Sequence, residues 1–72
     1  MQEYEIYCQS LEDAKTIATR LLLAPGSMYV RISSNFITVL TTNSMTRLWQ
    51  DVKFLGMQEK LDYTPSIKLI SE

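Results

Sequence analysis

Apolar and polar residues alternate along four segments of the chain, and this two-residue period predicts β-strands with one buried face. In the first segment, Tyr4, Ile6 and Cys8 share the side expected to enter the core. The third segment has the β-branched composition of a strand, but either of its faces could be the buried one. One face carries Ile37 and Val39, and the other carries Phe36 and Leu40. The expected strands cover residues 3–9, 28–33, 36–42 and 66–71.

Two other segments repeat their apolar residues at helical spacing. Ser10 reads as the N-cap of the first helix, with Asp13 as a shorter version of the capping-box acid, and Pro25-Gly26 ends that helix. Asn43 or Ser44 caps the second. Gly56 is a candidate for its left-handed C-terminal residue, unless 57–65 extends the helix. The expected apolar stripes are Leu11, Ala14, Ala18, Leu21 and Leu22, with Ile17 at the edge, and Met45, Leu48, Trp49, Val52 and Leu55.

The order strand–helix–strand–strand–helix–strand is the split βαβ pattern of ferredoxin-like domains. Right-handed crossovers place both helices on one face of a four-stranded antiparallel sheet with strand order 4-1-3-2. The chain of 72 residues is therefore expected to form a single α+β domain over 1–72.

The sheet face without helices is the candidate binding surface. If Ile6, Val30, Ile37 and Ile67 point toward the helices, aromatic, apolar and charged residues point away from them. A single helical layer leaves that face uncovered, and large exposed apolar patches usually mark interfaces. The residues predicted to form this surface are Tyr7, Tyr29, Arg31, Phe36, Thr38, Leu40 and Lys68.

The residue types present argue against catalysis. The chain contains no histidine, which excludes Ser-His and Cys-His nucleophiles. Cys8 lies on the presumed core face and is interpreted as structural, because reactive thiols need exposure and nearby positive charge. Neither glycine belongs to a phosphate-binding loop. Acidic pairs such as Glu59 with Asp62 are better explained as solvated helix ends. We predict no catalytic residue, no cofactor and no metal site.

Charge and hydropathy restrict the partners. Seven basic against eight acidic residues disfavour a nucleic-acid partner, and no apolar run approaches the length of a membrane span. One cysteine and an acidic start without a signal-peptide pattern indicate the cytoplasm. We expect a non-enzymatic protein-interaction module that binds a protein partner or forms a homo-oligomer. Small cytosolic regulators and inhibitors, including those of phages and mobile elements, often act in this way.

Two alternatives remain. Tyr7 on the first strand suits a single-stranded nucleic-acid platform, although the third strand offers only Phe36. The other is a small-ligand or metal-response domain. Residues Glu12–Leu22, Phe36–Thr42 and Tyr63–Ile67 resemble, in motif order, the CutA divalent-cation-tolerance family. That resemblance implies a trimeric ferredoxin-like fold. The chain lacks the family's long central hairpin and any histidine, so no metal site is carried over.

The run Leu21-Leu22-Leu23, together with Trp49 and Phe54, supplies more apolar bulk than two single-stripe helices need. Leu23 and Phe54 fall off the main stripes. They either wrap the ends of the small core or extend an interaction surface, and the first interpretation is favoured.

Overall fold

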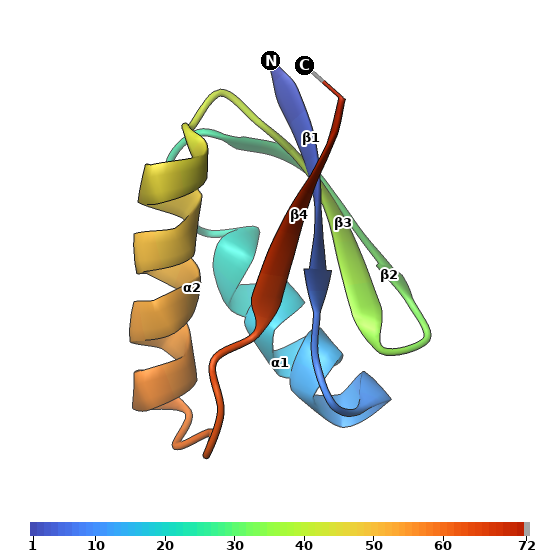
Figure 1. Cartoon of the computed structure of the whole chain (residues 1–72), viewed down its shortest axis with the longest axis vertical. Helices are drawn as coiled ribbons and strands as arrows, with labels where there is room; N and C mark the ends of the chain where they lie inside the picture. Colours follow the sequence, from blue (N-terminus) through green and yellow to red (C-terminus); the bar gives the residue numbers. More distant parts are fainter. Residues whose placement is uncertain (72) are drawn as a thin grey trace.

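The computed structural model describes residues 1–71, without the side chains of Ser27 and Met28. Its elements are β1 (Gln2–Tyr7), α1 (Leu11–Leu21), β2 (Ser27–Ser33), β3 (Phe36–Thr41), α2 (Met45–Gln58) and β4 (Ser66–Ser71). The four strands form one antiparallel sheet in the order β2-β3-β1-β4. Both helices lie on the same side of it (Figure 1). The predicted ferredoxin-like α+β fold is confirmed.

The core lies between the helices and one face of the sheet. Tyr4 and Ile6 of β1 pair with Val39 and Ile37 of β3, and all four side chains are buried. This settles the competition in β3: Ile37 and Val39 face the helices, so Phe36 and Leu40 lie on the opposite face. The β2–β3 turn has the predicted two residues, and the first, Ser34, has a φ of 57°.

Helix α1 begins as predicted, because the Ser10 side chain accepts a hydrogen bond from the Asp13 amide. Its buried stripe is Ala14, Ile17, Ala18 and Leu21. Ile17 is therefore central and not at the edge of the stripe. Leu11 and Leu22, expected in the stripe, are exposed. They flank the helix at its first residue and its C-cap, beyond the part that packs on the sheet.

Helix α2 is capped by Ser44 and continues through Gly56 to Gln58. Gly56 as the left-handed terminal residue was a wrong expectation, since Lys60 takes that conformation with a φ of 61°. Gly56 is buried because the chain after the helix crosses it. A Cβ there would lie 3.7 Å from the Leu61 side chain and 3.8 Å from Pro65. No helix in residues 1–71 has the length and apolar character needed to cross a membrane.

The surplus apolar residues of the helices do not complete the core. Leu23 is 81% exposed and Phe54 is 64% exposed, so the favoured core interpretation was wrong for both. The physical reason is the small size of the sheet, because each helix has room for one narrow stripe. Trp49, expected in the stripe of α2, is also exposed, and the Lys53 ammonium lies 4.9 Å from its ring centroid.

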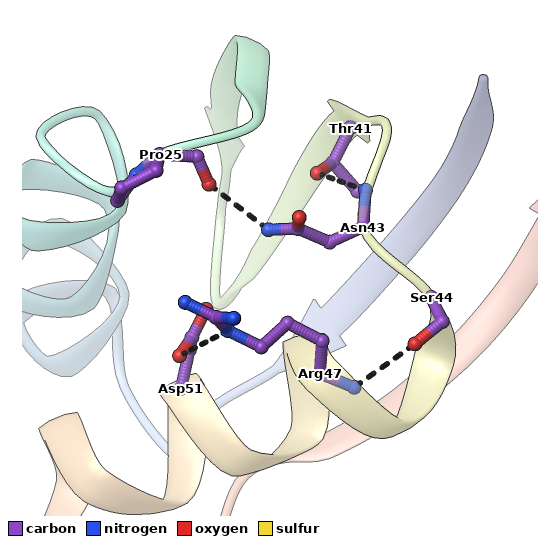
Figure 2. Close-up of polar contacts among 6 residues, drawn as sticks. All are labelled: Pro25, Thr41, Asn43, Ser44, Arg47 and Asp51. Carbon is purple, nitrogen blue, oxygen red and sulfur yellow. Dashed lines mark hydrogen bonds and ion pairs between the residues drawn. The ribbon is translucent and has the colours of Figure 1, made fainter.

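Polar contacts attach the helical layer to the sheet at both ends. Near the start of α2, the Asn43 side chain donates to the Pro25 carbonyl at 3.0 Å, and the backbone N–H of Asn43 donates to the Thr41 hydroxyl (Figure 2). Gly26, with a φ of 91°, sits against Asn43. At the other end, the Tyr63 hydroxyl donates to Asp13 at 2.6 Å.

Candidate functional site

The open sheet face consists of three rows of residues that cross all four strands, as the strand registers show. The row nearest the β2–β3 turn is Ser66, Tyr7, Phe36 and Ser33; the middle row is Lys68, Glu5, Thr38 and Arg31; the third is Ser71, Glu3, Leu40 and Tyr29. All seven residues predicted for the binding surface are in these rows. The structure therefore brings them together on one face.

An aromatic pair occupies the centre of the first row. Tyr7 and Phe36 are cross-strand partners with ring centroids 5.4 Å apart and a tilt of 34° between the rings. The Tyr7 hydroxyl donates a hydrogen bond to the Glu5 carboxylate on the same face. This bond is the main reason that the pKa of Tyr7 is raised, with desolvation and the charge of Glu5 adding to it. Tyr7, Phe36 and Glu5 thus form one connected group.

The middle row carries separated charges. Lys68 stands opposite Glu5, yet the ion pairs in the described part of the chain are Arg20–Glu59 and Arg47–Asp51. Glu5 is engaged by Tyr7 instead. Arg31, at the other end of the row, is likewise without an ionic partner among these residues. Between them, Thr38 is only 7% exposed, because its neighbours on the same face shield its short side chain.

The apolar part of the face lies along β2 and β3. Tyr29 is 50% exposed with the partly exposed Leu40 opposite it, and Phe36 is partly exposed two rows away on β3. Ile70 adds apolar surface next to the bulge of β4. No element in residues 1–71 covers this face, because both helices pack on the other one (Figure 1). Chemically, it offers aromatic and apolar contact, with cations on its outer strands and the Glu3 and Glu5 carboxylates on the inner strand β1.

The sheet edges are less suited to binding than the face. β2 and β4 are the two outermost strands. Each contains one cation, Arg31 or Lys68, and each contains a register irregularity. Edge cations and bulges are features that oppose pairing with a further strand. The two edge strands are therefore poorly suited to the addition of a further strand.

Cys8 and its surroundings have the character of a structural cluster. The thiol is buried, and burial raises its pKa; the charge of Asp13 adds to this, while a hydrogen bond with Tyr63 acts against it. Tyr63 also accepts from the Gln9 amide at 3.0 Å. A thiol with a raised pKa is a poor nucleophile. Glu59, which the sequence analysis considered together with Asp62, forms an ion pair with Arg20 of α1.

Sequence reasoning missed the hydrogen bond between Tyr7 and Glu5 and the shielding of Thr38. The i, i+2 spacing of Tyr7 and Glu5 on one strand was a usable signal for the first. Sequence reasoning had disfavoured exposure of Leu23 and Phe54, which are exposed on the helical side of the molecule, as are Leu22 and Met57. The surplus of apolar residues over the two stripes was the signal for that exposure.

Comparisons with known proteins return no matching family model, curated protein or solved structure. The topology implied by the resemblance to the CutA family is present, whereas its trimeric assembly stays a prediction. Among the described residues, no three His, Cys, Asp or Glu side chains are grouped to hold a metal ion, and no pocket is formed. Within residues 1–71, the open sheet face is the candidate functional site.

Proposed function

We propose that this chain is a non-enzymatic protein-interaction module that works by covering a protein surface with its open sheet face. The observation that supports this most is the exposure of Tyr29, Leu40 and Phe36 together on a face that no element of residues 1–71 covers. Burying aromatic surface is a main source of binding free energy at interfaces. A small regulator or inhibitor in the cytoplasm is the biological role that fits such a module.

The charge pattern favours a protein over a nucleic acid as the partner. A single strand that crossed the sheet from Lys68 to Arg31 would pass over Glu5, with Glu3 in the next row. Phosphates would therefore meet two carboxylates at the centre of the face. A protein surface can place a cation there and carboxylates at the margins, which gives electrostatic complementarity.

The test compares two variants that each remove two exposed apolar side chains. Tyr29→Ala/Leu40→Ala changes the open sheet face, and Leu22→Ala/Leu23→Ala changes the helical side of the molecule. Each purified chain is used to capture partners from the native cytosol, and the mass of each complex is then measured. We expect the wild type and the Leu22/Leu23 variant to retain the same complex. The Tyr29/Leu40 variant should bind at least about tenfold less, which corresponds to about 1.4 kcal/mol.

Two outcomes would contradict the proposal. One is a wild-type chain that is monomeric and captures nothing. The other is a complex that the Tyr29/Leu40 variant retains in full. Circular dichroism of both variants checks that the fold is intact, so that a lost complex reports on the surface.

A second candidate, binding of single-stranded nucleic acid, has one observation in its favour. Tyr7 and Phe36 lie side by side on the two central strands, where bases can stack on a four-stranded sheet. Titration of a labelled oligouridine at low salt tests it. Binding that weakens with added salt and with Phe36→Ala supports this function, and absence of binding at low salt ends it.

A further inference from the structure

We propose that the partner of the open sheet face is a second copy of this chain, with the two sheets crossing at nearly a right angle. This inference rests on the proposed function, because it names the occupant of the same surface. It depends on where the charges and aromatic rings lie on the face. Two-fold symmetric dimers present the same patch from both chains, so the patch must be complementary to itself.

The positions on the face can be placed by the regular geometry of a sheet. Neighbouring strands are about 4.8 Å apart and residues advance about 3.3 Å along a strand. Arg31 and Lys68 lie on the outer strands in the middle row, so each is about 7 Å from the centre of the face. The Glu3–Leu40 and Tyr7–Phe36 pairs lie on the inner strands, also about 7 Å from the centre but along the strand direction.

Aligned packing of two such faces brings like charges together. If the two-fold axis runs along the strands, it sets Lys68 of one copy against Arg31 of the other. If it runs across the strands, each strand lies on its own counterpart, so that Lys68 meets Lys68 and Glu5 meets Glu5. Like charges brought together in this way oppose association.

Crossed packing replaces these clashes with attractive contacts. A rotation of about 90° carries the two cation positions onto the Glu3–Leu40 pair and the Tyr7–Phe36 pair. One cation then meets the Glu3 carboxylate, and the other lies over aromatic rings, as in a cation–π contact. Orthogonal crossing is one of the two ways in which sheets pack face to face. The direction of crossing decides whether Arg31 or Lys68 meets Glu3.

The centre of the face also suits this arrangement. Glu5 lies beside the two-fold axis, where two carboxylates would repel one another. Its carboxylate accepts a hydrogen bond from the Tyr7 hydroxyl, which draws it toward the first row. In the crossing that sets Lys68 against Glu3, this shift is away from the two-fold axis. Thr38, the other residue beside the axis, is short, uncharged and almost buried. The two central positions therefore leave room for the second sheet.

Sedimentation velocity of the full chain over a range of concentrations tests the proposal. The variants are Glu3→Lys, Arg31→Glu and Lys68→Glu, with Lys15→Glu on the exposed surface of α1 as the control. Its charge change equals that of the two cation reversals and matches Glu3→Lys in size but not in sign. We expect a wild-type dimer, a Glu3→Lys dimer that is about tenfold weaker or more, and no effect of Lys15→Glu. The reversed cation that meets Glu3 should weaken the dimer in the same way.

Mixing gives the decisive measurement. When Glu3→Lys is mixed with the reversed-cation variant that opposes it, one symmetric contact is native and the other has its charges exchanged. A heterodimer of nearly wild-type affinity should form with either Arg31→Glu or Lys68→Glu. The two substitutions in each mixture are in different chains. An interaction between Glu3 and Lys68 of the same chain therefore cannot restore the affinity.

Three results would overturn the crossed dimer. They are a monomer at every concentration, a dimer unchanged by Glu3→Lys, and failure of both mixtures to restore binding. A monomeric wild type that still captures another protein through Tyr29 and Leu40 would overturn this inference and leave the proposed function standing. A wild type that neither dimerises nor captures another protein would refute both the crossed dimer and the proposed function.

Discussion

The two faces of the sheet are made by alternate residues of the same four strands, yet they follow different rules. On the face covered by helices, Tyr4, Ile6, Ile37 and Val39 are at most 2% exposed and pack with α1 and α2. On the open sheet face, charges, aromatic rings and Thr38 share three rows. Packing against the helices restricts the first set to apolar side chains. The second set is not restricted in that way, and the proposed function gives a reason for its mixed composition.

The largest effect is expected when the covered face is damaged. Ile37→Ala removes a completely buried side chain from the central strand β3 and should cost about 2–5 kcal/mol. A core of this size supplies only about 3–5 kcal/mol of net stability, so the variant should be largely unfolded at 25 °C. Denaturant unfolding followed by circular dichroism measures the loss.

The matched substitution on the open sheet face is Leu40→Ala, three residues further along the same strand. Leu40 is already partly exposed, so its truncation should cost less than about 1 kcal/mol. Equal destabilisation by Ile37→Ala and Leu40→Ala would show that the two faces are not distinct, and that a second layer covers the open one.

The difference between the two faces also explains which features of the fold could be predicted from the sequence. The strands followed from the two-residue period, because Tyr4, Ile6 and Val30 could only fill a core on one side. Their order in the sheet followed from the split βαβ sequence of elements with right-handed crossovers. In β3 the period was ambiguous, since Phe36 and Leu40 are as apolar as Ile37 and Val39. Only pairing with β1 decides between them, and pairing is a contact between distant parts of the chain.

The candidate surface was predicted as a set of residues but not as a pattern. The rows that place Lys68 beside Glu5 and Arg31 beside Thr38 depend on three strand registers at once. Hydrophobic periodicity gives the face of a residue, whereas its neighbours require the register. Likewise, periodicity does not give the width of the sheet, which is why Leu23 and Phe54 were assigned to the core.

The attachment of the helical layer provides an intermediate effect, through the two glycines of the chain. A Cβ at Gly26 would lie 2.6 Å from the Asn43 side chain, and its φ of 91° is strained for alanine. Gly26→Ala should therefore cost about 1–3 kcal/mol. At Gly56, a helical residue, the nearest atom would be 3.7 Å away. Gly56→Ala should be neutral or should stabilise by up to about 1 kcal/mol.

Unfolding midpoints of both glycine variants check this prediction. Similar losses at Gly26 and Gly56 would mean that helix α2 and the loop before β2 tolerate side chains alike. The junction shown in Figure 2 would then have no special part in holding the helices over the covered face.

A small effect that depends on pH is expected at the opposite junction, where Tyr63 joins Asp13 and Gln9. Tyr63→Phe removes these hydrogen bonds and should cost about 1 kcal/mol at pH 8. Burial, followed by the hydrogen bond to Asp13, raises the pKa of Tyr63 from 10 to about 12. Because the unfolded chain then ionises first, the stability that Tyr63 contributes is complete below pH 10 and is lost as the pH rises to 12.

The difference in unfolding free energy between wild type and Tyr63→Phe should therefore shrink between pH 10 and pH 12. Both chains should carry Cys8→Ala, so that the neighbouring thiol does not titrate in the same range. A difference that stays constant up to pH 12 would mean that the Tyr63 phenol ionises alike in the folded and unfolded chains. The hydrogen bond from Tyr63 to Asp13 would then give the folded chain no preference for the neutral phenol.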